Sequence, residues 1–422
     1  MAALLNKLFA VGPFWFGIIS AMPALANAAN LLLIPLAGRF MSVRDMTLSM
    51  SSINAGLWLC GLISIALLPL DQPNQVGLFF CIFYALTTLS LSLCVVGWTS
   101  WLGDFVPEQI RGRYMGRRNR FTNLSTLAFM LVSLCLLEWM HASRTAYIIL
   151  ASIAIGGRFT AILYMHLIKS KDPTGGQIMS ANWGKDFSKL IREQSYFRFV
   201  IFGSCAGFFM GFQGAAATLF TFDILKASAA EFTGYSIVAT LAGTLCVKIW
   251  GEAIDRHGAA PILIISFVAW RCGDFGWLFL TEGTRNWMFL IWIWGGSMAT
   301  GYLLASFNLL LKLIPKHSRS TGVSLNLTMT SITGIIAPIL AGSLIGWSTT
   351  NVTNVDFVYR MVIFIGLVGS LSSALILKGI KEPSSNPTEN TIQGAMRTLR
   401  QQSVSQGVAF ISSITFIVRK RD

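Results

Sequence analysis

Long apolar runs separated by short polar stretches make up most of this chain. A run of roughly twenty apolar residues is long enough to cross the hydrocarbon core of a bilayer as an α-helix. The pattern therefore predicts an all-α polytopic membrane protein with about eleven transmembrane helices. The predicted spans cover residues 8–36, 46–70, 77–101, 121–137, 147–168, 197–222, 233–250, 259–280, 287–311, 323–347 and 358–377.

A long polar stretch divides these runs into two groups, and a polar tail follows the second group. Five runs precede the long polar stretch near the middle of the chain, and six follow it. We expect an N-terminal helix bundle over residues 1–168, a cytoplasmic linker over 169–196, a C-terminal helix bundle over 197–380 and a polar cytoplasmic tail over 381–422.

The linker and the tail each contain one short apolar segment. In the linker, helical spacing places Phe187, Leu190 and Ile191 on one face with basic residues beside them. This predicts a short amphipathic helix at the cytoplasmic membrane surface, with a solvated linker as the alternative. In the tail, residues 408–418 are too few to span a bilayer, so we expect them to lie on a surface.

The first run has the features of a signal peptide as well as those of a retained helix. Lys7 precedes it, and Ala24-Leu-Ala26 has the small residues of a cleavage site. The apolar character continues through residues 30–36, well beyond that point. We therefore expect a retained transmembrane helix.

Composition agrees with a membrane protein and excludes several other classes. Hydrophobic residues make up 54% of the chain and charged residues only 12%, whereas about a quarter of residues are charged in soluble domains. The seven cysteines fall inside predicted spans without a Cys-x-x-Cys motif, and the four histidines are scattered. We therefore expect neither a metal nor a cofactor. The chain has no His-Glu-x-x-His motif and no pair of intramembrane aspartates, so we do not expect an enzyme.

The net charge of +14 reflects membrane topology rather than an affinity for nucleic acid. Lysines and arginines gather in alternate polar stretches, with 24 on one side of the membrane and four on the other. Cytoplasmic segments carry this excess. The count places the C-terminus in the cytoplasm and, with eleven spans, the N-terminus outside. We expect a monomeric integral protein of the bacterial inner (plasma) membrane, with the lipid bilayer around it and no nucleic-acid partner.

The polar stretch from Asp104 to Asn119 carries the most distinctive motif. It contains Asp-x-Val-Pro-Glu-x-x-Arg-Gly-Arg-Tyr-x-Gly-Arg-Arg-Asn, and five arginines fall within residues 111–120. We interpret it as a short cytoplasmic loop between two spans. The motif resembles the loop after the fourth helix in one branch of the major facilitator superfamily of membrane transporters. This resemblance implies two pseudo-symmetric helix bundles that rock about a central site.

A second motif extends the resemblance to the other half of the chain. Residues 251–258 fit Gly-x-x-x-Asp-Arg-x-Gly, which in the superfamily links the second and third helices of each half. Its counterpart before residue 46 keeps Arg39 but has Gly38 in place of the aspartate. Pro107-x-x-x-Arg also recurs 208 residues later. This register makes the first run the family's second helix, so the family's first helix is absent from the sequence. A gene start further upstream, a fragment and a lost helix are the three explanations.

The resemblance implies that the cytoplasmic motifs act as a conformational latch between the halves. Charged residues at helix ends pair across the halves in the inward-closed state and separate when it opens, and glycines permit close helix approach. For Arg117, Arg118 and Arg120 a role in topology alone is the alternative. The candidate latch residues are Asp104, Arg111, Gly112, Arg113, Gly116, Gly251, Asp255, Arg256 and Gly258.

Candidate solute-binding residues are polar groups at mid-membrane depth, where an ionisable side chain is costly. Arg158 lies near the middle of its span and has no carboxylate nearby in sequence, so we expect it to bind an anionic or strongly polar solute. Arg271 and Asp274 are three residues apart on one helical face, and an internal salt bridge is their alternative role. Weaker candidates are Asn27, Asn30 and Gln213.

These features predict a secondary-active transporter of a small solute that works by alternating access. Co-transport of a proton or sodium ion usually needs a membrane carboxylate, and Asp274 is the one that lies well inside a span. The alternative is a non-transporting membrane receptor or assembly factor with the same fold. The degenerate first motif and the missing first helix keep this alternative open.

Overall fold

The chain folds into long helices that run side by side. The computed structural model describes residues 4–9, 11–37, 41–67, 73–105, 108–168, 183–314, 319–380 and 382, and these residues contain helices and no strand. The elements are η1 (Leu4–Leu8), α1 (Pro13–Ala37), α2 (Val43–Leu67), α3 (Pro73–Phe105), α4 (Glu108–Trp139), α5 (Arg144–Leu167), α6 (Trp183–Arg192), α7 (Gln194–Asp223), α8 (Ala229–His257), α9 (Ala259–Gly273), η2 (Asp274–Phe279), η3 (Glu282–Trp287), α10 (Met288–Leu313), α11 (Arg319–Asn351), α12 (Val355–Ser373) and η5 (Ala374–Leu377).

The number of spans agrees with the sequence pattern. Within the described residues, nine helices are long and apolar enough to cross a membrane. Two further helices, α1 and α4, contain shorter apolar stretches at Pro13–Ala29 and Leu124–Trp139. Together they account for the all-α fold with about eleven transmembrane helices that the apolar runs predict.

The arginine-rich motif is helical, and the prediction of a loop there was wrong. Helix α3 continues to Phe105, and α4 begins at Glu108, so residues 111–120 form the first turns of α4. Arginine, glutamate and glutamine favour the helical conformation nearly as well as leucine does. The helix therefore extends through the polar motif to its apolar part. The side chains of residues 101–120 lie outside the described part of the structure.

A short helix, α6 (Trp183–Arg192), lies in the range expected for the linker. Helix α6 packs against α7 and α11. Leu190 is buried in the same apolar cluster as Phe199 and Phe202 of α7. Beside it, the Tyr196 hydroxyl donates a hydrogen bond of 2.7 Å to the Gly322 carbonyl of α11. The remainder of the linker and the tail, including residues 408–418, lies outside the described residues.

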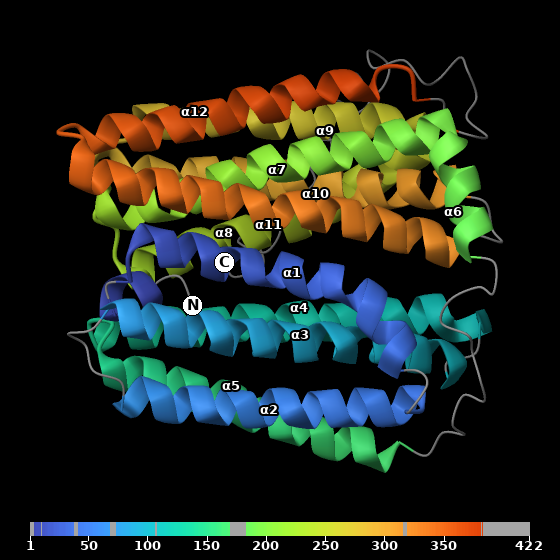
Figure 1. Ribbon diagram of the computed structural model, residues 1–422, viewed down its shortest axis with the longest axis horizontal. Coiled ribbons are helices and arrows are strands. Elements are labelled where there is room, and N and C mark those ends of the chain that lie inside the picture. Colours follow the sequence, from blue (N-terminus) through green and yellow to red (C-terminus); the bar gives the residue numbers. More distant parts are fainter. Residues whose placement is uncertain are drawn as a thin grey trace, which may run out of the picture.

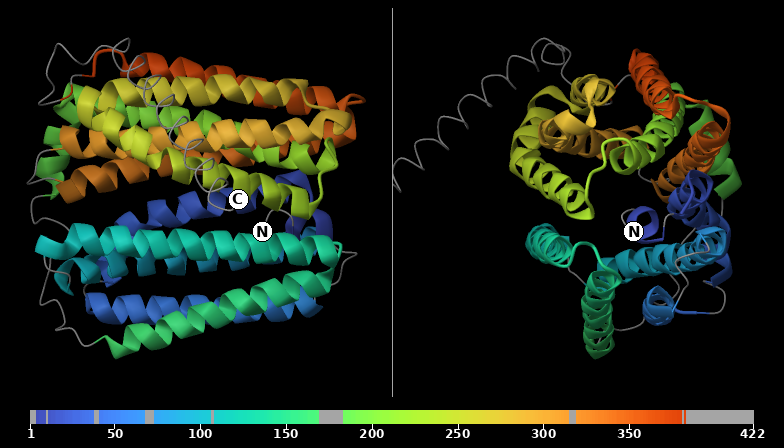
Figure 2. Two further views of the ribbon diagram at one scale, coloured as in Figure 1. Left: turned by 180° about the vertical axis from the view of Figure 1, so that it is seen from behind. Right: turned by 90° about the vertical axis from the view of Figure 1, so that its left-hand side faces the viewer.

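Two groups of helices are visible in Figures 1 and 2, with α1 between them. Helices α7–α12 form one group and α2–α5 the other. Across the boundary, α1 packs along α11 and α4 along α8. If α1 of one half corresponds to α8 of the other, and α4 corresponds to α11, then the α1–α11 contact is equivalent to the α8–α4 contact. Two pseudo-symmetric halves are expected to show this relation. We call the group α1–α5 the first half and α7–α12 the second half.

Glycines allow α1 and α11 to approach closely. A Cβ atom added at Gly342 would lie 2.5 Å from the Pro13 carbonyl oxygen, and one at Gly17 would clash with the Pro338 carbonyl. Small residues at such crossings are typical of membrane helix packing. The N-terminal part of α1 therefore forms the tightest described junction between the halves.

The two apolar clusters lie at opposite ends of the molecule. One cluster joins both halves near the start of α1, with Phe9 and Phe80 from the first half and Leu219 and Tyr359 from the second. The other cluster draws its buried residues from the second half and α6 alone, among the described residues. The described core thus connects the halves at one end only.

Candidate functional site

A cavity of about 380 Å³ lies within the second half, between α7, α8, α9, η2 and α10. Three indole rings line it, from Trp270, Trp277 and Trp292, and we call it the tryptophan cavity. Its polar lining comes mainly from Gln213, Arg271 and Asp274. A volume in this range is typical of a small-molecule site.

The three polar residues form one hydrogen-bonded group. Arg271 forms an ion pair with Asp274 through Nη2, and its Nη1 donates to the Gln213 Oε1 of α7 at 2.7 Å. The side chains of Arg271 and Asp274 are 4% and 7% exposed. The guanidinium also lies 4.4 Å from the centroid of the Trp270 ring. Each buried charge therefore has its counter-charge, which is what makes burial of either tolerable.

Asp274 reaches this group because α9 ends early. The regular helix stops at Gly273, and Asp274 opens the 3₁₀ turn η2, which also carries Trp277. A Cβ atom at Gly273 would collide with the Trp294 ring, so only glycine fits where the chain changes its pitch. The predicted span over residues 259–280 agrees with the candidate span Ala259–Phe279, which contains both α9 and η2.

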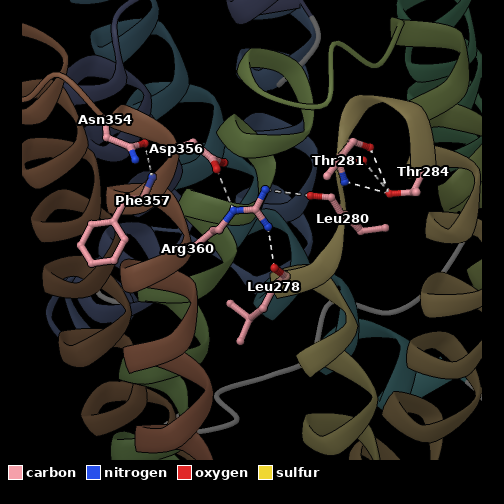
Figure 3. Close-up of polar contacts among 8 residues, drawn as sticks. All are labelled: Leu278, Leu280, Thr281, Thr284, Asn354, Asp356, Phe357 and Arg360. Carbon is pink, nitrogen blue, oxygen red and sulfur yellow. Dashed lines mark hydrogen bonds and ion pairs between the residues drawn. The ribbon is translucent and has the colours of Figure 1, made fainter.

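Arg360 of α12 holds the far end of η2 in place (Figure 3). Its guanidinium donates to the carbonyls of Leu278 and Leu280, the second at 2.9 Å, and its Nε donates to Asp356 at 2.8 Å. Carbonyls at a helix end have no partner within the helix. Arg360 therefore satisfies two of them and fixes the turn that presents Asp274 and Trp277.

A second cavity, of about 410 Å³, lies between the halves, and we call it the interface cavity. Phe16, Ile19 and Tyr84 line it from the first half, and Gly334 and Pro338 of α11 line it from the second. The two cavities are neighbours, because three residues line both of them: Gly214, Thr218 and Phe232.

The segment before α1 closes one end of the interface cavity. Leu5 lines the cavity and is 1% exposed. Asn6 donates to Asp223 Oδ1 at 3.1 Å, and the Tyr359 hydroxyl donates to the other oxygen of the same carboxylate at 2.6 Å. On the other side, the rings of Phe9 and Phe80 lie 5.4 Å apart. The segment is thus attached to both halves.

Arg158 lies away from both cavities. It donates a hydrogen bond to Asn54 Oδ1 of α2, and its guanidinium carbon lies 5.5 Å from the Trp58 ring centroid. Asn54 is 1% exposed and donates in turn to the Thr87 carbonyl and the Ser90 hydroxyl of α3. These bonds tie α2, α3 and α5 together. Neither cavity lining includes Arg158.

Of the two asparagine candidates, only Asn27 has a described side chain, and it does not line the tryptophan cavity. Asn27 is exposed and accepts a hydrogen bond of 3.0 Å from Ser92 of α3. Asn30 belongs to α1, and its side chain lies outside the described part. Of the six predicted binding residues, the structure thus brings together Gln213, Arg271 and Asp274.

The second latch motif lies at the junction of α8 and α9. Gly258 has φ +85°, a conformation that favours glycine, and it separates the two helices. Asp255 and Arg256 are exposed in the last turn of α8, and neither forms an ion pair with a side chain that the structure describes. Gly251 has open space where a Cβ would lie. The side chains of the first motif, from Asp104 to Gly116, are outside the described part.

Glu382 binds the start of α9 at this same junction, which the sequence did not predict. Its carboxylate accepts from the amides of Ala259 and Ala260 at 3.1 and 2.9 Å and pairs with Lys312 of α10 at 2.6 Å. Burial would raise the pKa of Glu382, but the bonds from Lys312 and the two amides outweigh it and hold the pKa below its usual value of 4.5. No local pattern links residues more than a hundred positions apart.

The sequence analysis also missed the aromatic lining of the tryptophan cavity, although the sequence shows the tryptophans that form it. Of the chain's 13 tryptophans, three line one cavity. Their presence in neighbouring spans was visible, but the shared cavity depends on how α9, η2 and α10 pack. In the part of the chain that the structure describes, no three His, Cys, Asp or Glu side chains gather as metal ligands.

Two helical bundles with a cavity at their boundary define a transporter-like membrane protein, and the comparisons give its family. The sequence model of the Major Facilitator Superfamily matches residues 205–419, about half of the chain. The chain belongs to this superfamily of membrane transporters, and it is a secondary transporter of a small solute. A search among curated proteins found no match.

Solved structures show the same fold at low sequence identity. The nucleoside transporter NupG is 12% identical, with 89% of this chain and 94% of that chain covered and a TM-score of 0.64. A D-xylose–proton symporter is 14% identical, with 90% and 92% covered and a TM-score of 0.66. A bacterial homologue of the human lysosomal transporter Spinster, inward-facing and unoccupied, is 13% identical, with 95% and 92% covered and a TM-score of 0.61.

Proposed function

We propose that this transporter works by alternating access around the tryptophan cavity and the interface cavity. The observation that carries the proposal is the shared lining of the two cavities at Gly214, Thr218 and Phe232. A solute held in the second half can meet the first half at this place. Rocking of the halves about such a site then exposes it to each side of the membrane in turn.

We further propose that the conformation is inward-facing. The described contacts between the halves gather near the start of α1 and of α8, for example Gly17 against Pro338 and Leu134 against Gly234. The excess of lysine and arginine puts the opposite end in the cytoplasm. Asp255 and Arg256 at that end are exposed and form no ion pair with a described side chain, as expected of an open latch.

Asp274 is our candidate for proton coupling. It is a buried carboxylate that lines the cavity, and Arg271 is its counter-charge among the described lining residues. Protonation would remove its charge and weaken the ion pair, so that proton binding and solute binding would affect one another. The D-xylose–proton symporter of the same fold gives a precedent for this type of coupling. Sodium is the competing coupling ion.

The remaining proposals concern the setting of the protein. We propose a monomer in the inner membrane of a bacterium with a cytoplasmic C-terminus, on the basis of the charge asymmetry. Nothing in the described residues favours a non-transporting receptor or assembly factor over a transporter.

Reconstitution into vesicles tests the function directly. We expect purified protein to move a nucleoside, the solute of one transporter with the same fold, and an imposed pH gradient to drive accumulation. The variant Arg271→Gln/Asp274→Asn, which removes both charges together, should lose the response to the pH gradient. Glu282→Gln, an exposed carboxylate in η3, is the matched control. A response that persists in the double variant, or depends on sodium alone, would reject Asp274 as the proton site.

A further inference from the structure

The described lining of the tryptophan cavity has no net charge to offer a solute. Arg271 and Asp274 are the charged residues among those that line it, and they neutralise one another. Both Nη groups of Arg271 already have acceptors, in Asp274 and Gln213. A charged solute would therefore enter without a counter-charge, and burial of an unpaired charge is strongly unfavourable.

The walls of the cavity are flat and apolar. Indole rings come from α9, η2 and α10, and Phe232 of α8 packs edge-on against Trp292 at a ring separation of 5.6 Å. Glycines 214, 295 and 296 also line the cavity, and Gly214 has open space where a Cβ would lie. Aromatic walls favour a planar ring that stacks or packs edge-to-face against them.

Two hydrogen-bond donors on the lining residues lack an acceptor. The Trp292 Nε1 and the Arg271 Nε are buried, and neither has a partner among the described residues. A buried donor without an acceptor costs free energy, which a ligand carrying an acceptor can recover. Neighbouring atoms cover both donors in this conformation, so they become available when the cavity adjusts around a solute.

We propose that the tryptophan cavity selects an uncharged solute with a planar ring and a carbonyl-type hydrogen-bond acceptor. This inference rests on the proposed function of the cavity and specifies the chemistry of its solute. The neutral ion pair excludes carboxylates, phosphates and amines. The indole walls select the ring, and the two unpartnered donors select the acceptor.

A set of matched ligands tests each part of this proposal. Benzamide, benzoate and benzylamine share one ring and differ in charge, and butyramide keeps the amide without the ring. We expect calorimetry on the detergent-purified full chain at pH 7 to show benzamide binding at least tenfold more tightly than each of the other three. Benzoate or benzylamine binding as tightly as benzamide would overturn the neutral character, and butyramide doing so would overturn the role of the ring.

One variant isolates the indole donor. Trp292→Phe keeps an aromatic wall and removes the N–H, so we expect benzamide affinity to fall about fivefold, the effect of one neutral hydrogen bond. Trp294→Phe on the same helix is the control, because Trp294 is outside the cavity lining and donates to the Ala269 carbonyl at 2.8 Å. Thermal unfolding of both variants separates a loss of binding from a loss of folding. Equal affinities in wild type and Trp292→Phe would overturn the role of this donor.

The binding experiment and the transport experiment test different proposals, and either can fail without the other. If vesicles accumulate a solute while benzamide does not bind, the inferred solute chemistry is wrong and the proposed function stands. If benzamide binds in the expected order while no solute moves in vesicles, the cavity chemistry stands and the transport proposal fails.

Discussion

The arginines within the membrane spans of this protein differ in the groups that contact their guanidinium. Arg271 has a carboxylate partner, whereas the described partners of Arg158 are an amide and an indole ring. An arginine keeps its proton under all ordinary conditions, so each must find such partners or water. A buried aspartate differs, because it can become neutral by binding a proton.

This difference predicts unequal costs for breaking the Arg271–Asp274 pair. Asp274→Asn leaves a buried guanidinium without a counter-charge, and we expect it to cost about 3–5 kcal/mol of unfolding free energy. Arg271→Gln should cost less, since Asp274 can take up a proton. The double variant should also cost less than Asp274→Asn. Denaturation of the three variants in detergent measures the order, and an Arg271→Gln variant less stable than Asp274→Asn would contradict it.

The contacts of Arg158 favour a structural role over the predicted role in solute binding. We expect Arg158→Gln to lower the unfolding temperature, because it leaves Asn54 in a buried site with one partner fewer, at a cost of about 1–3 kcal/mol. Solute affinity should stay unchanged, since neither cavity includes Arg158. Calorimetry and thermal unfolding on the same preparation check both statements. A stable Arg158→Gln protein that loses affinity would restore the original hypothesis.

At the scale of elements, the turn η2 controls how the second half presents its site. Arg360 is a positioning residue, because it touches the η2 carbonyls and not the cavity. We expect Arg360→Ala to raise amide hydrogen exchange across residues 274–287 and to cost about 2–3 kcal/mol, as charged hydrogen bonds are lost. Lys248→Ala, which removes an exposed ion pair with Glu252, should leave exchange there unchanged. Unaltered exchange in Arg360→Ala would show that η2 holds its shape unaided.

The Glu382 junction predicts a pH dependence of stability. Because the folded-state pKa lies below 4.5, its contribution is fully present above about pH 4.5 and is lost as the pH falls through the lower folded-state value. We expect wild type to be more stable than Glu382→Gln at pH 7 and the difference to shrink below pH 4.5. Denaturation at several pH values measures this difference. A gap that widens on acidification would contradict the assignment.

The elements themselves were largely predictable, and the reasons for the exceptions are local. Apolar runs identify spans because the bilayer demands a fixed length of helix. They do not show where a helix continues past the membrane, as α4 does from Glu108, or where it tightens, as α9 does after Gly273. Helix propensity and a single glycine decide those points. Arg271 and Asp274 were found from their charges within an apolar run and their spacing, whereas Glu382 needed the fold.

On the scale of the whole molecule, contacts between the halves determine how they can move. The Cδ1 atom of Leu134 of α4 lies 4.0 Å from the position of a Cβ at Gly234 of α8. In a background without the native cysteines, we expect Leu134→Cys/Gly234→Cys to form a disulfide that stops transport, with activity restored by reductant. Each single cysteine variant is the control. Undiminished transport in the oxidised double variant would show that this end of the halves need not separate.

The arrangement of the halves was predictable only in outline. Charge asymmetry and repeated motifs indicated two related bundles, because both leave marks in the sequence. The cavities left none, since their walls come from helices far apart in the chain, such as Tyr84 of α3 and Pro338 of α11. In the second half, α7 packs against α11 and α12, and no described helix takes the corresponding place in the first half.

The meeting of the two cavities at Phe232 has a pharmacological consequence. A ring that fills the tryptophan cavity touches the second half alone, so it can travel with that half as the molecule rocks. A longer compound, with the same ring and an arm that passes Gly214 and Thr218 into the interface cavity, would lie against Phe16 and Tyr84 as well. Such a compound would contact both halves and hinder their movement relative to one another. It would bind without being carried, and lengthening a cargo would turn it into an inhibitor.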